Sequence, residues 1–170
     1  VEGLEPLDSE RAAEFAHVLR RLTFGPFPGQ VEDALDRHRS VDELIDALID
    51  APPIPFRPPI SLDRPFSMKD EKVIGNDQLV RHWVARMTED QAGLHERMMW
   101  FWHTVWTTSA EKGNFLMLWK TLAKYHEHAI TDLGDLAKTL VVDPSMLQFL
   151  DGDGSNFGSP NENLGREQME

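Results

Sequence analysis

The chain has 170 residues, no cysteine, and 29 acidic against 17 basic side chains, which gives a formal net charge of -12. This length suits one domain with its own core, and the negative charge disfavours nucleic acid or an anionic lipid surface as a partner. The lack of cysteine excludes disulfides, thiolate metal sites and cysteine nucleophiles. No apolar run approaches the roughly 20 residues that span a bilayer. Residues 1–7 lack the features of a signal peptide, so either the protein is not exported by one or the chain begins after it.

Three amphipathic helices are predicted in the first 50 residues. The first follows Asp8 or Ser9 and ends at Gly25, and the second opens after residues 28–29. The third begins at a capping box formed by Ser40 and Glu43. Apolar side chains recur at helical spacing along all three and should face a core. They are Phe15, Val18, Leu19, Leu22, Val31, Ala34, Leu35, Val41, Leu44, Ile45, Leu48 and Ile49.

Six prolines lie between Ala51 and Met68 and are interleaved with apolar residues. Proline at this density prevents a helix and disfavours a central strand. The embedded apolar side chains favour an extended strap laid over the helices rather than a free linker. These side chains are Ile54, Phe56, Ile60 and Phe66.

Residues 94–112 carry the densest run of apolar and aromatic side chains in the chain. Thr88 and Gln91 form a capping box, so a helix should begin near Glu89 and continue through Trp106. Its predicted inner face is Leu94, Met98, Phe101, Trp102 and Val105, and Met99, Trp100 and Trp106 cover most of the rest. A helix that is apolar almost all round is typically buried. We therefore expect this to be the central helix, with Trp102 deep in the core.

Further helices flank the central one. Asn76 or Asp77 caps the preceding helix, Gly113 and Asn114 precede the next, and Thr131 or Asp132 begins another. Asp143 with Pro144 forms an N-cap and N1 pair. The side chains predicted to face inward are Leu79, Val80, Trp83, Met87, Phe115, Leu118, Trp119, Leu122, Tyr125, Ala129, Leu133, Leu136, Ala137, Leu140 and Val141. The sequence thus predicts an all-α fold, an irregular multi-helix bundle around one apolar central helix with a Pro-rich extended strap.

His103 lies within the apolar run of the central helix. It could be a ligand or a proton-transfer residue. The other interpretation is a core histidine whose two ring nitrogens are satisfied by one carboxylate or carbonyl, and the sequence alone favours this second interpretation.

Residues 151–162 match a calcium loop of the helix-loop-helix type at several ligand positions. Asp151, Asp153 and Glu162 would supply the carboxylates. Asn156 stands where glycine is expected and Gly158 where an apolar residue normally packs. Calcium is therefore one hypothesis, and a solvated loop whose side chains cap its own backbone is the other.

A second polar group follows this loop, with five hydrogen-bonding side chains in seven positions. Glu162 and Arg166 stand at i, i+4, which a surface ion pair explains. The group could equally form a buried polar network. Its members are Asn161, Glu162, Asn163, Arg166 and Glu167.

Three motifs resemble a family. LRRLTFGP near the start, ERMMWFWHTVWTTSAEK in the middle, and DPSMLQFLDGDGS followed by PNENLGRE at the end are similar to the N-terminal part of the bacterial proteins grouped as domain of unknown function 1800. The resemblance implies a mostly helical protein, often exported to the periplasm or beyond, with no established activity. Family members usually continue past the last motif, so residues 1–170 are expected to form a single helical domain, the N-terminal fragment of a larger one.

The resemblance leads to two hypotheses of function. In the first, an envelope-associated enzyme or metal-binding protein has a polar site where His103 faces Glu162, Arg166 and Glu167, the candidate catalytic residues. Asp151, Asp153 and Glu162 are the candidate metal ligands. Val105 stands where the family commonly has a second histidine, which weakens any site that needs two imidazoles. In the second, the chain is a structural or interaction module whose polar motif is a buried stabilising network and whose Pro-rich strap covers an apolar groove. The partner would be another protein or the missing C-terminal part of the same family domain.

Overall fold

The computed structural model describes residues 6–59, 75–89 and 93–169. These residues form nine α-helices and no strand, which confirms the all-α class. None of the described helices combines the length and apolar character needed to cross a membrane. The backbone divides into two compact units, residues 1–55 with 86–97 and residues 56–85 with 98–170. The expectation of a single domain stays a prediction.

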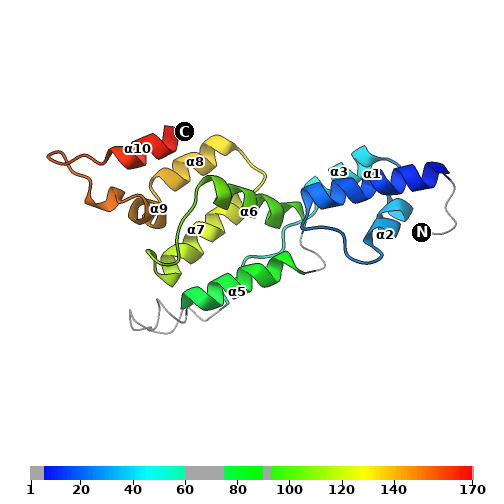
Figure 1. The fold of residues 1–170 in the computed structure, drawn as a ribbon, viewed down its shortest axis with the longest axis horizontal. Coiled ribbons are helices and arrows are strands. Elements are labelled where there is room, and N and C mark those ends of the chain that lie inside the picture. The colour runs from blue at the N-terminus through cyan, green and yellow to red at the C-terminus, as the bar shows by residue number, and fades with distance from the viewer. Residues whose placement is uncertain (1–5, 60–74, 90–92, 170) are drawn as a thin grey trace. The chain divides into compact units, whose positions relative to one another are not determined.

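The first unit contains three helices in which α1 contacts both of the others (Figure 1). They are α1 (Pro6–Leu22), α2 (Gln30–Arg37) and α3 (Val41–Asp50). The apolar positions predicted from helical spacing form this core, except Ile49, which is exposed. Phe15, Leu19 and Leu44 are its most deeply buried members. The amphipathic patterns therefore place these helices correctly.

Local hydrogen bonds explain where the first helices end and begin. The Thr23 hydroxyl donates to the Leu19 carbonyl at 2.6 Å and accepts from the Gly25 amide at 3.1 Å. Gly25 then has a φ of 110°, a conformation that favours glycine and stops the helix. Ser40 caps α3 by accepting from the Glu43 amide at 3.2 Å, as predicted. The LTFGP part of the first motif is thus a helix-ending device.

Residues 51–59 of the predicted strap contain no helix, as the prolines predict, and the remainder of the strap lies outside the described residues. Within the first unit, Arg86 of α5 (Asn76–Met87) donates to the carbonyls of Ile54 at 2.9 Å and Pro55 at 3.0 Å. The same guanidinium pairs with Glu96 of α6 (Leu94–Val105), and the side chains of Arg86 and Glu96 are 3% and 2% exposed. A buried ion pair therefore fastens the start of the strap.

The second unit is centred on α7 (Phe115–Glu127), which contacts both α8 (Leu133–Val141) and α9 (Pro144–Phe149). Every apolar side chain predicted to face inward from residues 115–129 is buried. Phe56 of the strap stacks on Trp119 with ring centroids 4.3 Å apart. The unit continues through a short 3₁₀ turn (Gly152–Gly154) into α10 (Glu162–Met169). Its core therefore lies along α7.

Helix α6 differs from the prediction. It begins at Leu94 rather than near Glu89, and Gln91 of the predicted capping box lies outside the described residues. Met99 is fully buried, but the side chains of three neighbours are largely exposed: Trp100 40%, Phe101 47% and Val105 51%. Trp102 is only partly buried, with its indole N–H donating to the Ala129 carbonyl at 2.8 Å. The expectation that this helix is buried on all sides, with Trp102 deep in the core, is wrong.

The orientation of α6 was predicted wrongly because apolar side chains surround the second half of this helix. Their periodicity therefore cannot indicate which face is buried. Polar contacts indicate that face instead. Glu96 pairs with Arg86, and His103 is partly buried against two aromatic rings. Four positions on other helices that were predicted to face inward are also exposed, namely Ile49, Val80, Leu133 and Val141.

Candidate functional site

Asp143, which opens the third motif, is completely buried and connects helices. Its Oδ1 accepts from the amides of Ser145 at 2.9 Å and Met146 at 3.2 Å, which caps α9 as predicted. The Thr121 hydroxyl donates to Oδ1 at 2.8 Å, and Lys124 donates to Oδ2 at 2.5 Å. The hydrogen bonds of this carboxylate thus hold α7 and α9 together.

Asn161 has two structural roles at the start of α10. Its side-chain amide donates to the carbonyls of Leu150 at 3.0 Å and Asp151 at 2.5 Å. Its Oδ1 accepts from the amides of Asn163 at 2.8 Å and Leu164 at 3.2 Å. One side chain therefore caps α10 and closes the loop that precedes it.

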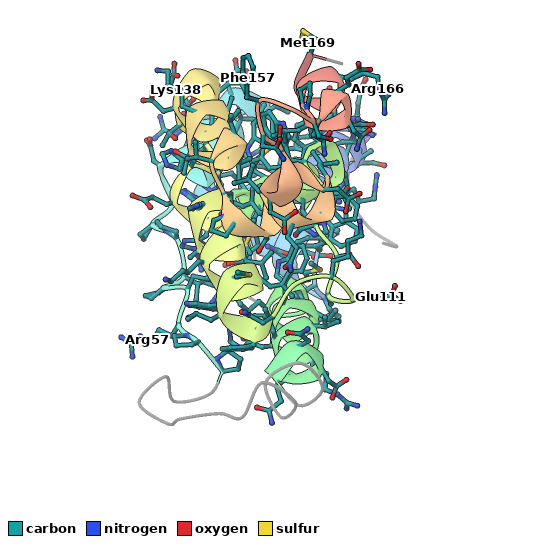
Figure 2. All side chains as sticks on the ribbon, turned by 90° about the vertical axis from the view of Figure 1, so that its left-hand side faces the viewer. Arg57, Glu111, Lys138, Phe157, Arg166 and Met169 are labelled. Carbon is teal, nitrogen blue, oxygen red and sulfur yellow. The ribbon has the colours of Figure 1, made fainter. Side chains whose placement is uncertain are left out.

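Three predicted site residues on α10 lie at the surface. Glu162, Arg166 and Glu167 are all exposed. Arg166 donates to Asn163 Oδ1 at 2.9 Å and pairs with Glu167 along the helix, and Figure 2 shows its side chain at the edge of the unit. The alternative of a buried polar network is therefore wrong for these three side chains.

His103 lies in an aromatic environment in the second unit. Its ring is edge-on to Trp83 at 4.9 Å and to Tyr125 at 6.0 Å between centroids. Burial lowers the pKa of His103, and a hydrogen bond to the Thr108 backbone opposes that shift only in part. A neutral imidazole that donates one N–H to this carbonyl keeps a lone pair on its second nitrogen. Such a ring can accept a proton or bind a ligand.

The indole N–H of Trp83 adds a polar group beside His103. Trp83 is buried, and its Nε1 has no hydrogen-bond partner within the described ranges. The contacts around the His103 ring come from Trp83, Tyr125 and Thr108. A site that His103 shares with Glu162, Arg166 and Glu167 stays a prediction.

The loop before α10 does not have the geometry of the predicted calcium site. Asp151, Asp153 and Glu162 are exposed, and Asp151 pairs with Lys112 at 3.1 Å. In the part of the chain that the structure describes, no three Asp, Glu or His side chains are grouped so that they could hold a metal ion. Calcium binding would require these carboxylates to move toward one another.

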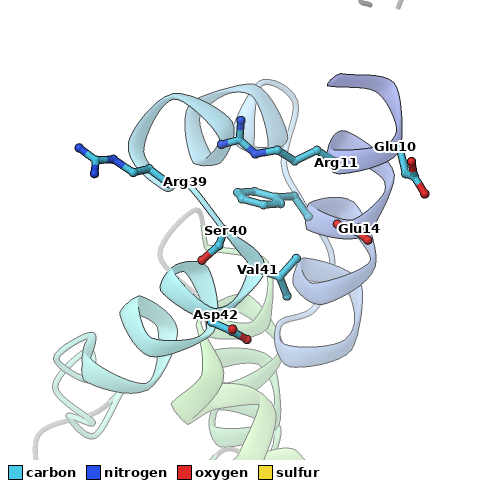
Figure 3. A pocket seen from close by; sticks show the side chains of 8 residues that line it. Glu10, Arg11, Glu14, Arg39, Ser40, Val41 and Asp42 are labelled. Carbon is cyan, nitrogen blue, oxygen red and sulfur yellow. The ribbon is translucent and has the colours of Figure 1, made fainter. Parts of the chain in front are cut away.

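The first unit contains a shallow groove of about 660 Å³ between α1 and the start of α3 (Figure 3). Arg11 lies in it and donates to the carbonyl oxygens of Leu35 at 3.1 Å and of His38. Figure 3 shows Glu10 and Arg11 pointing to opposite sides of α1, with Arg39 pointing outward. Arg11 thus closes the end of α2, and the mixed charges around it favour no single ligand. Sequence analysis missed this residue because it belongs to no motif.

Sequence analysis also missed a group of exposed apolar side chains on α5 and α6 of the second unit, which we call the α5–α6 apolar surface. It consists of Val80, Val84, Trp100, Phe101 and Val105. The rings of Trp83 and Trp100 lie 5.6 Å apart, which places the two helices together there. Large aromatic side chains on a helix surface are typical of sites that bind other molecules.

Fold and sites together define an all-helical protein in which buried motif residues such as Asp143 cap and connect helices. The family model described as "Protein of unknown function (DUF1800)" matches residues 17–170, so the chain belongs to this family and the resemblance seen in the three motifs is confirmed. No curated protein and no solved structure matches the chain.

Proposed function

We propose that the protein is an interaction module that binds another polypeptide through the α5–α6 apolar surface. The observation that carries the proposal is the exposure of Trp100, Phe101 and Val105 in the second half of one helix, where Phe101 and Val105 stand one turn apart. Burying apolar area is favourable by roughly 25 cal/mol per Å². Tryptophan and other aromatic residues are also enriched where protein partners contribute most of their binding energy.

The hydrogen bonds that the motif residues make within the fold support the same proposal. Asp143 and Asn161 direct their hydrogen bonds at helix ends and at the loop before α10. These side chains therefore stabilise the fold. A stable fold with exposed aromatic side chains is suited to binding another protein. We infer that the partner contributes an apolar helix face or strip, because α6 offers exposed apolar side chains at helical spacing.

Site-specific photo-crosslinking tests this proposal. A photoreactive phenylalanine analogue at position 101 or 105 should give a discrete adduct of higher mass in the organism that produces the chain. Matched probes at Glu111 and Lys138, which are exposed polar positions (Figure 2), should give none. Adducts of equal yield at all four positions, or none at 101 and 105, would reject the α5–α6 apolar surface as the binding site.

A second candidate function rests on His103. We propose it as a proton-transfer or ligand-binding residue of an envelope-associated enzyme or metal-binding protein, in a polar site shared with Glu162, Arg166 and Glu167. The supporting observation is a partly buried imidazole that packs edge-on against Trp83 and Tyr125 and whose pKa is lowered by burial.

The titration of the His103 ring by NMR distinguishes a shared site from an isolated histidine. A carboxylate close to an imidazole raises its pKa, so Glu162→Gln or Glu167→Gln should lower the His103 midpoint if they share a site. Glu32→Gln, an exposed position on α2 in the first unit, is the control. An unchanged midpoint in both α10 variants would remove Glu162 and Glu167 from any site at His103.

A further inference from the structure

The loop between α9 and α10 presents one aromatic side chain on a frame of hydrogen bonds. We infer that Phe157, at the tip of this loop, anchors a docking site for a partner protein that has an apolar pocket bordered by lysine or arginine. This site goes beyond the proposed function, because it lies on a different element from the α5–α6 apolar surface and different substitutions test it.

The tip of the loop is a tight turn closed in both directions. The Asn156 amide donates to the Ser159 carbonyl at 3.2 Å, and the Ser159 amide donates to the Asn156 carbonyl at 3.1 Å. Asn156 Oδ1 accepts from the amides of Gly158 and Ser159, both at 3.0 Å. Its side-chain amide donates to the Gly154 carbonyl at 3.2 Å. The conformation of the turn is therefore fixed by these hydrogen bonds in the unbound protein.

The base of the loop is fastened as well. The Asn161 amide donates to the Ser155 hydroxyl at 3.0 Å, and its side chain holds the Leu150 and Asp151 carbonyls. A Cβ at Gly152 would lie 2.9 Å from the Leu164 side chain, so α10 packs closely against the loop at that point. A loop that is ordered at its tip and its base loses less conformational entropy on binding than a free segment.

The hydrogen-bonded turn does not bury the Phe157 side chain. Its side chain is fully exposed, at 106% of the reference area, and lies at the outer edge of the unit (Figure 2). A rigid aromatic side chain that enters a partner's pocket is the usual form of a binding hot spot. The pre-organised turn and the exposed ring together point to recognition and not to support of the fold.

The charges around the loop identify the chemistry of the partner. Residues 151–162 contain Asp151, Asp153 and Glu162 and no lysine or arginine. Lys112 pairs with Asp151, and the exposed Asp153 and Glu162 flank the turn. Complementary charge speeds encounter and selects partners, which favours a cationic rim around the pocket. The net charge of -12 disfavours a second copy of the chain as the occupant.

Selection from a random peptide library on the immobilised full chain, followed by fluorescence anisotropy, tests the inference. The enriched peptides should combine lysine or arginine with apolar side chains and should bind more weakly as salt is added. Phe157→Ser should weaken their binding by about tenfold or more. Phe157→Trp should retain most of the affinity, and Asn156→Ala should lose part of it because the turn is released.

Two controls separate this site from other surfaces and from loss of folding. Leu133→Ser removes an exposed apolar side chain elsewhere in the second unit and should leave peptide binding unchanged. Phe101→Ser does the same on the α5–α6 apolar surface, so its effect reports on the proposed function alone. Thermal unfolding of Phe157→Ser should match that of the unsubstituted chain, because the ring contacts no core. A library that yields no peptide sensitive to Phe157→Ser, or only peptides without basic residues, overturns the inference.

Discussion

Helices α6 and α7 have similar length and similar aromatic content, yet their apolar side chains differ in how far they are buried. In α7, polar side chains such as Lys120 and Glu127 mark one face, and the apolar side chains of the opposite face are buried. In the second half of α6, apolar side chains occupy every face, and Trp100, Phe101 and Val105 remain exposed. Apolar content therefore does not determine burial, whereas the contrast between two faces of a helix does.

The inner face of α6 is instead selected by polar contacts that are distant in the sequence. Glu96 pairs with Arg86, ten positions earlier, and His103 contacts Tyr125 on α7. A buried carboxylate must find a partner, so it orients the helix more strongly than one more apolar side chain would. Substitutions on the two helices can break or sharpen this comparison.

The largest effect should come from Glu96→Ala. Removing one partner of a fully buried ion pair leaves the Arg86 charge uncompensated, which costs about 3 to 5 kcal/mol in the free energy of unfolding. Glu96→Gln, which keeps the shape and one acceptor, should cost less. Urea unfolding of the two variants checks this, and a loss below about 1 kcal/mol for Glu96→Ala would show that the pair does not orient α6.

A comparable or slightly smaller loss is expected from Trp119→Ala on α7. Trp119 is buried and stacks on Phe56, and truncating a large buried aromatic costs about 3 to 5 kcal/mol. Phe101→Ser on α6 is the matched control and should cost only about 1 kcal/mol in the free energy of unfolding, because its half-exposed ring contacts Trp102 alone among the aromatic rings described. Equal losses at Trp119 and Phe101 in chemical unfolding would remove the difference between the helices.

The smallest effect concerns His103 and pH. Because burial lowers its pKa in the folded state, the unfolded chain binds a proton first as the pH falls below the ordinary value of about 6.5. The contribution of His103 to stability is thus complete above that value and decreases as the pH falls from there toward the folded pKa. Replacing His103 with Gln should flatten this part of a plot of unfolding free energy against pH. An unchanged slope would show that His103 is not buried as a neutral ring.

Local signals in the sequence predicted much of the fold. Ser40, Asp132 and Asp143 cap their helices as expected, because a cap depends on residues two or three positions away. The buried face of α7 also followed from spacing alone. The Arg86 contacts with the strap and with Glu96 could not be predicted, since they join segments that no local pattern relates.

The candidate site was less accessible to sequence reasoning. Asn161 was noted only as one member of a polar group, whereas its side chain closes a loop ten residues long through two backbone carbonyls. Phe157 lies within the predicted calcium loop, whose pattern concerns oxygen ligands and not side-chain rings, and the exposure of its ring depends on how the turn folds. Motif residues such as Asn161 therefore mark positions where side chains hold helix ends and loops in place. The exposed aromatic side chains between the motifs mark the positions where we propose binding.

Hydroxyl-radical footprinting read by mass spectrometry tests the central comparison most directly, because it measures solvent access at each aromatic side chain of the isolated protein. We expect rapid oxidation of Trp100 and Phe101 on α6, and strong protection of Phe115, Trp119 and Tyr125 on α7. Protection of Trp100 and Phe101 as strong as that of Trp119 would contradict the α5–α6 apolar surface and the function proposed for it.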